Sequence, residues 1–196
     1  MTSRFHIGVI GDGTAGRGTK SFRLGQELGH ALVDAGYRVV TGGLGGVMEA
    51  ACRGARSSNR HRAGDIIGIL PGRDPAIANA HVDIAIPTGL DHLRNSIVAQ
   101  SHALVAIGGG AGTLSEICFG WIYKRLIIAL GNEGWAGKLA GAPLDNRKRF
   151  PGTIPDDQIY GAASAREAIR LLKGLLPLYS RQQTRRSWHA RKVPTS

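Results

Sequence analysis

Short, wholly apolar runs recur along this chain, and each is followed by glycine or proline and then by a segment with helical periodicity. The two clearest runs, Ala103–Ile107 and Leu126–Leu130, are five residues long. Runs without alternating polar residues are typical of strands buried on both faces, and such strands occur in parallel sheets that helices cover on both sides. The sequence therefore predicts an α/β fold, a single Rossmann-like, doubly wound domain with a mainly parallel sheet.

The expected elements alternate along residues 1–180, which we predict to form one nucleotide- or cofactor-binding domain. Helix 165–176 opens with Ser164-Ala-Arg-Glu167, which has the form of a capping box. The stretch 131–155, rich in glycine, proline and charge, is expected to form an irregular lid or edge. Strands are predicted at 5–10, 38–41, 65–70, 82–86, 103–107 and 126–130, and helices at about 21–35, 47–56, 90–101, 112–124 and 165–176.

The formal net charge of +11 is concentrated in two places. Residues 181–196 hold five basic and no acidic side chains and are expected to form a basic, flexible tail, and a second basic cluster spans Arg53–Arg62. Such clusters attract phosphates, but aromatic residues at 6% are too few for a platform on which bases stack. Nucleic acid is therefore the weaker expectation, although the basic tail does not exclude it.

Several classes of protein and site are not expected from the sequence. The longest apolar runs are too short to span a bilayer, and the first residues do not form a signal peptide, so we expect a cytoplasmic protein without a membrane partner. The two cysteines, Cys52 and Cys118, each fall in a predicted helix and are expected to be small buried residues. No metal site is predicted.

The first predicted strand ends in Gly11-Asp-Gly13-Thr-Ala-Gly16, which matches the dinucleotide fingerprint G-x-G-x-x-G. The second strand, however, ends in Thr41-Gly42-Gly43, where a dinucleotide site needs an acidic residue for the ribose hydroxyls. NAD is therefore not expected as a cofactor. Gly11 and Gly13 are still expected to border a phosphorylated ligand.

A second glycine-rich segment joins the second strand to a helix. Gly42, Gly43, Gly45 and Gly46 lack a β-carbon, so ligand atoms could lie directly against this backbone, with Met48 and Glu49 beside them. The alternative is a tight turn that serves packing alone.

The strongest signal is the segment Gly108–Glu116, which follows a buried strand and opens a helix. Free N–H groups and the positive end of the helix converge there, so an anion would be held by backbone donors and by the Thr113 hydroxyl. The residues expected to bind phosphate here are Gly108, Gly109, Gly110, Gly112 and Thr113. As an alternative, Thr113 and Glu116 could form a capping box, Thr-x-x-Glu.

Arg94 and Asn95 lie in the helix that precedes this strand, on the same expected edge of the sheet. A guanidinium group there could bind phosphate in a bidentate manner. Pyridoxal phosphate is not expected, because none of the six lysines lies at a strand-end loop with a His or Ser partner.

The order of these motifs resembles the molybdenum cofactor carrier protein family. That family belongs to a superfamily with the Lonely Guy phosphoribohydrolases, which have long been mislabelled as lysine decarboxylases. The resemblance covers about residues 5–130 and implies a Rossmann-like fold, a nucleotide or pterin-phosphate ligand such as the molybdenum cofactor, and a homodimer or homotetramer. It is carried by Gly42–Ala50, Ala78–Asn79, Ile86–Leu90, Arg94-Asn95 and Ile107–Glu116.

The hydrolases carry P-G-G-x-G-T-x-x-E where this chain has Gly108–Glu116, and their helix arginine corresponds to Arg94. By resemblance, Arg94 and Glu116 would be the catalytic residues if the chain is a hydrolase that cleaves the N-glycosidic bond of a nucleoside 5′-monophosphate. Two departures, Gly108 for proline and Asn95 for lysine, match the carrier branch instead. We therefore expect a carrier of a phosphorylated ligand, with the hydrolase as the alternative.

Overall fold

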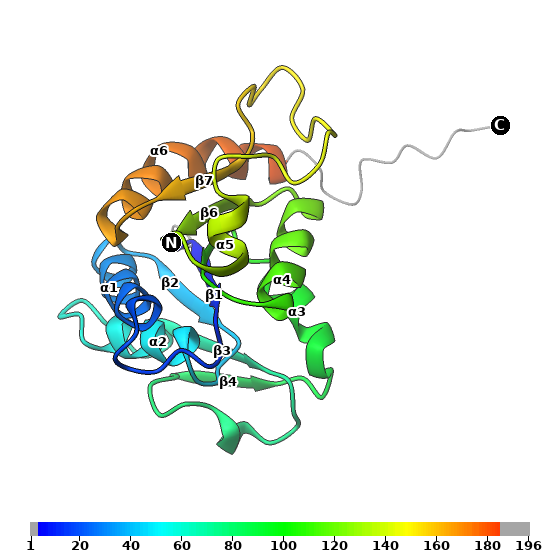
Figure 1. The fold of residues 1–196 in the computed structure, drawn as a ribbon. Helices are drawn as coiled ribbons and strands as arrows, with labels where there is room; N and C mark the ends of the chain where they lie inside the picture. The colour runs from blue at the N-terminus through cyan, green and yellow to red at the C-terminus, as the bar shows by residue number, and fades with distance from the viewer. Residues whose placement is uncertain (1–3, 185–196) are drawn as a thin grey trace.

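The computed structural model describes residues 4–184 and contains one seven-stranded sheet in which every neighbouring pair of strands is parallel (Figure 1). The strand order is β4-β3-β2-β1-β5-β6-β7, so the order reverses between β1 and β5. This confirms the predicted doubly wound, Rossmann-like fold. The strands are β1 (His6–Gly11), β2 (Arg38–Thr41), β3 (Ile66–Leu70), β4 (Ile84–Pro87), β5 (Ala103–Ile107), β6 (Leu126–Leu130) and β7 (Ile159–Ala162).

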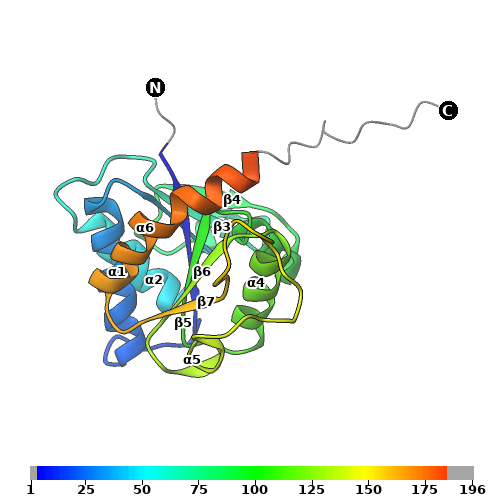
Figure 2. The ribbon, with the colours of Figure 1, turned by 90° about the horizontal axis from the view of Figure 1, so that it is seen from above.

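Helices cover both faces of the sheet, with α1, α2 and α6 on one side and α4 on the other (Figure 2). Side chains of α3 and α5 belong to the same apolar cluster as those of α4. The helices are α1 (Lys20–Asp34), α2 (Val47–Arg56), α3 (Asn95–Val98), α4 (Ala111–Ile122), α5 (Gly134–Leu139) and α6 (Ala165–Thr184), with 3-10 turns η1 (Pro75–Ile77) and η2 (Asp91–Arg94). None of the helices within residues 4–184 is long and apolar enough to cross a membrane.

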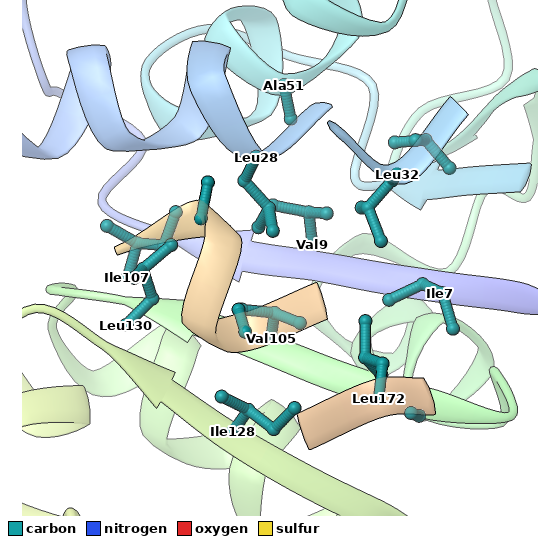
Figure 3. Packing of buried hydrophobic residues seen from close by; sticks show 14 of the residues in the cluster. Ile7, Val9, Leu28, Leu32, Ala51, Val105, Ile107, Ile128, Leu130 and Leu172 are labelled. Atoms are coloured by element: carbon teal, nitrogen blue, oxygen red, sulfur yellow. The ribbon is translucent and has the colours of Figure 1, made fainter. Parts of the chain in front are cut away.

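Strand β5 is apolar throughout because both of its faces are buried. Val105 packs in the layer that contains Leu28 of α1 and Leu172 of α6 (Figure 3). Leu104 points to the opposite layer, with Ile117 of α4. The two-residue period of a strand thus sends neighbouring side chains into two separate cores.

The region predicted as an irregular lid, 131–155, contains helix α5, and strand β7 follows the region at Ile159–Ala162; the sequence patterns indicated neither element. Helix α5 and strand β7 are short, and β7 includes Tyr160 and Gly161, so neither has the long apolar pattern from which the other elements were predicted. The connection between them is held by Arg149, whose guanidinium group pairs with Asp157 at 2.7 and 2.6 Å and lies over the ring of Trp121, 3.5 Å from its centroid.

Two predicted helices differ from the structure at their ends. The helix expected at 90–101 is shorter: it consists of η2 and α3 and ends at Val98, and Asp91 at its start has a positive φ of 49°, which a regular right-handed helix does not contain. Helix α6 continues past Pro177 to Thr184, since Leu176 and Tyr179 remain buried against the sheet while Pro177 is exposed. The first four residues of the predicted tail are therefore helical, and residues 185–196 lie outside the described part of the chain.

The capping box predicted at the start of α6 forms in part, because the second hydrogen bond comes from Ala163 and not from the N-cap Ser164. The Ser164 hydroxyl accepts a hydrogen bond from the Glu167 N–H at 3.3 Å, and the Glu167 carboxylate accepts one from the Ala163 N–H at 2.9 Å.

Candidate functional site

A pocket of about 220 Å³ opens beside the carboxyl ends of β1 and β5. This is the point where the strand order reverses, and such crevices are where open α/β sheets bind ligands. The pocket is lined by Ile10, Gly11, Gly13, Met48, His92, Arg94, Asn95, Gly110, Gly112, Thr113 and Glu116. Segments predicted to bind the ligand from four separate stretches of sequence therefore meet at one place.

An ion pair between Arg94 and Glu116 forms one wall of the pocket. Arg94 Nη1 donates to Glu116 Oε1 at 3.2 Å, and the two residues are only 8% and 6% exposed. The guanidinium group lies against the backbone of Gly42, where a β-carbon would stand 2.6 Å from Arg94 Cζ. Arg94 Nε is buried and has no hydrogen-bond partner among residues 4–184. A cation with spare donors is therefore held at the pocket wall.

Burial raises the pKa of Glu116 to about 7, and the neighbouring Arg94 opposes part of that rise. Removing a carboxylate from water disfavours its charged form, so the neutral and ionised forms of Glu116 are both populated near neutral pH. A carboxyl group in this state can accept or donate a proton. Strongly shifted carboxyl groups of this kind occur often at functional sites.

The start of α4 also lines the pocket. The helix begins at Ala111 with Gly110 as its N-cap, and no side chain caps it. The Leu114 N–H bonds to the Gly110 carbonyl at 3.0 Å, so the N–H groups before Leu114 have no partner within the helix. Thr113 and Glu116 consequently do not form the capping box that the sequence left open.

Gly108 and Gly109, two of the glycines predicted to bind phosphate, lie against other residues of the protein and do not adjoin open space. Gly109 has a φ of +85°, and a β-carbon there would lie 2.8 Å from Thr113 Cγ2. A β-carbon on Gly108 would lie 3.2 Å from Ser21 Oγ. The carbonyls of Gly108 and Gly109 accept hydrogen bonds from Ala136 and Trp135 at 3.1 and 3.0 Å. Open space adjoins only Gly110 and Gly112 among the glycines of this loop.

The segment Gly42–Glu49 contributes less to the pocket lining than the sequence suggested. Met48 lines the pocket, whereas Gly42, Gly43, Gly45, Gly46 and Glu49 do not. A β-carbon on Gly43 or Gly46 would overlap with neighbouring parts of the protein, and Glu49 pairs with Arg17 at 3.3 Å. For Gly43 and Gly46 the geometry agrees with the packing alternative.

Asn95 links the helix that carries Arg94 to the first turn of α4. Its Nδ2 donates to Ser115 Oγ at 2.8 Å and lies 3.4 Å from the Gly112 carbonyl. These hydrogen bonds connect the start of α3 directly to the first turn of α4, next to the pocket.

The sequence reasoning missed Ile10 and His92, which also line the pocket. His92 precedes Arg94 by two residues in η2, and this short spacing was the one feature of the sequence that could have indicated His92 as a pocket residue. Within residues 4–184, no three His, Cys, Asp or Glu side chains gather in a way that could hold a metal ion.

Residues 4–155 match the model of the SLOG cluster4 family. The chain belongs to this family. A relative in Archaeoglobus fulgidus, an uncharacterized protein, is 42% identical over 112 residues, which cover 57% of this chain and 70% of the relative.

Solved structures are similar to this chain over about nine-tenths of its length. The molybdenum cofactor binding protein of the phototrophic bacterium Rippkaea orientalis is 30% identical with a TM-score of 0.73, covering 90% of this chain and 99% of that one. The molybdenum cofactor carrier protein of Chlamydomonas reinhardtii is 31% identical with a TM-score of 0.70, covering 89% and 99%. The predicted resemblance to molybdenum cofactor carrier proteins is confirmed.

Proposed function

We propose that the pocket binds the phosphate group of a small phosphorylated ligand and that the protein is a carrier of the molybdenum cofactor type. The observation that carries this proposal is that the buried Arg94 guanidinium and the start of α4, which no side chain caps, line the same pocket. A guanidinium fork and free backbone N–H groups are both strong donors to phosphate oxygens.

The pocket is large enough to enclose the phosphate end of a ligand but not the whole ligand. Its volume of about 220 Å³ is below the roughly 300–1,000 Å³ of pockets that enclose a whole small molecule. We infer that the remainder of the ligand extends past Met48 and His92. The thioether of Met48 can pack against a flat ring system such as a pterin. The residues present therefore fit the phosphate end of the cofactor.

The observation that favours a hydrolase as the second candidate is the pKa of about 7 of the buried Glu116. In that reaction the Glu116 carboxylate would stabilise the oxocarbenium character that develops at the sugar and orient a water molecule. Arg94 would hold the phosphate group.

Among residues 4–184 no lysine lines the pocket, which supports the proposal that the site does not use pyridoxal phosphate.

One incubation distinguishes the two candidates. The purified protein is mixed with AMP or with molybdopterin, and both ribose 5-phosphate release and ligand retention on a desalting column are measured. A carrier retains molybdopterin and releases no ribose 5-phosphate. Turnover of AMP that is lost in Glu116→Gln would instead establish the hydrolase.

We also propose that the protein forms a homo-oligomer through the uncovered side of β4 and η2. Ile84 and Ile86 are 45% and 42% exposed on the edge strand β4, and Leu93 is 67% exposed in η2. Large apolar side chains that remain exposed in one chain are candidates for a contact site between proteins. Light scattering should therefore give a mass of at least twice the 20.7 kDa of one chain, and Leu93→Glu should lower that mass. A monomeric wild-type protein would rule out this part of the proposal.

A further inference from the structure

The N-terminus of α1 lies beside the glycine loop that follows β5, but the proposed phosphate site does not use it. In doubly wound folds that bind dinucleotides, the pyrophosphate group sits at the start of the helix that follows the first strand. Here that helix, α1, begins at Lys20 and is 15 residues long. A second phosphate group would be expected at this position if the ligand carried one.

Protein side chains occupy this position. Ser21, in the first turn of α1, donates from Oγ to Glu133 Oε2 at 2.7 Å. Lys20 Nζ donates to the neighbouring Asn132 Oδ1 at 3.1 Å. A carboxylate therefore already lies at the positive end of α1, where the helix favours an anion.

The side chain of Glu133 is also close to the glycine loop that follows β5. A β-carbon on Gly108 would stand 3.2 Å from Ser21 Oγ and 4.0 Å from Glu133 Cβ. Glu133 is also held from its C-terminal side, because the N–H groups of Trp135 and Ala136 donate to the carbonyls of Gly109 and Gly108 at 3.0 and 3.1 Å. The position of Glu133 is thus set by α1 and by the glycine loop together.

We propose that Glu133 is a specificity-determining residue that takes the place of a second phosphate group. Its negative charge repels an anion next to the phosphate bound at α4, and its carboxylate already takes the hydrogen bond of Ser21 in the first turn of α1. The site consequently selects ligands with a single phosphate group over diphosphates and dinucleotides. This inference rests on the proposed binding of phosphate at Arg94 and α4.

The test compares inorganic phosphate with pyrophosphate by isothermal titration calorimetry at low ionic strength. The variant Glu133→Gln keeps the size of the side chain and an oxygen that accepts from Ser21, but it removes the charge. We expect pyrophosphate to bind this variant about tenfold more tightly than the wild type, with the affinity for phosphate changed less than about threefold. The increase should shrink as salt is added, since Glu133 is exposed.

Glu27→Gln is the matched control, because it also removes one negative charge, from a residue of α1 that lines a different surface hollow. It should leave both affinities unchanged. Equal gains in Glu27→Gln and Glu133→Gln, or an unchanged pyrophosphate affinity in Glu133→Gln, would overturn the role of Glu133 while the phosphate pocket stands. A wild-type protein that binds neither probe would overturn the phosphate pocket and this inference with it.

Discussion

The guanidinium group of Arg94 lies directly on the backbone of Gly42, so closely that a β-carbon at position 42 would stand 2.6 Å from Arg94 Cζ. Residue 42 follows β2 and residue 94 ends η2, so the glycine makes room for a charged group 52 positions away in the sequence. The position of the Arg94 side chain thus depends on the absence of a side chain at Gly42.

We therefore expect Gly42→Ala to displace Arg94 and to weaken phosphate binding about tenfold, which corresponds to 1.4 kcal/mol. Calorimetric titration with phosphate measures the loss, and circular dichroism checks that the variant is folded. Arg94→Gln should show a similar loss. If Gly42→Ala bound phosphate as the wild type does, the contact with Arg94 would not matter for the site.

The raised pKa of Glu116 predicts how stability changes with pH. Its pKa is about 7 in the folded protein and 4.5 as the ordinary value, so the folded state binds the proton more tightly than the unfolded state. The resulting stabilisation is complete below pH 4.5 and is lost as the pH rises through 7. Between these values the wild type should lose up to about 3 kcal/mol relative to Glu116→Gln.

Urea unfolding of both proteins at several pH values measures this difference. The experiment compares how each protein changes with pH, so a constant difference in stability between the two proteins does not affect it. Parallel pH profiles for wild type and Glu116→Gln would mean that the carboxyl group titrates at its ordinary value.

Gly109 and Gly110 should respond differently to alanine. Gly109 has a positive φ and faces Thr113, so Gly109→Ala should destabilise the protein by roughly 1–3 kcal/mol. A β-carbon on Gly110 meets no atom within 4 Å, so Gly110→Ala should change the free energy of unfolding by less than about 1 kcal/mol.

The pocket nevertheless opens at Gly110, and we expect the new methyl group to obstruct the ligand there. Gly110→Ala should therefore lose phosphate affinity while remaining as stable as the wild type. Thermal unfolding and calorimetric titration on the same samples separate the two effects. Undiminished binding in Gly110→Ala would indicate that the ligand does not approach this part of the loop.

Arg149 is expected to stabilise the connection between α5 and β7. Its side chain is 4% exposed and pairs with Asp157, which is itself 8% exposed. Arg149→Ala leaves the Asp157 carboxylate buried without its cation, although the Tyr179 hydroxyl still donates to it, so we expect a loss of roughly 3–5 kcal/mol in urea unfolding. The control is Arg147→Ala, since Arg147 is 91% exposed and should contribute less than about 0.5 kcal/mol. Equal effects of the two substitutions would contradict a stabilising role of the buried pair.

The sequence by itself determined the class of fold and most of the strands. The runs at 103–107 and 126–130 could be read because a strand buried on both faces must be apolar at every position. The sequence also indicated Glu116 and the start of α4, since a glycine-rich turn between a buried strand and a helix is a local pattern. Arg94 was indicated by its place in the segment before that strand. Helix α5 and strand β7 have no such pattern, because their short segments are stabilised mainly by contacts with other parts of the chain.

Only the tertiary structure decided which glycines face the pocket and which residue Glu116 pairs with. The sequence does not show whether the space beside a glycine is open to a ligand or is occupied by a side chain such as Thr113 or Arg94. Glu116 matched a capping box in sequence, but its partner is Arg94, 22 residues earlier, and its burial raises its pKa. Contacts and burial of this kind depend on distances between segments that are remote in sequence, and no local spacing of residues encodes them.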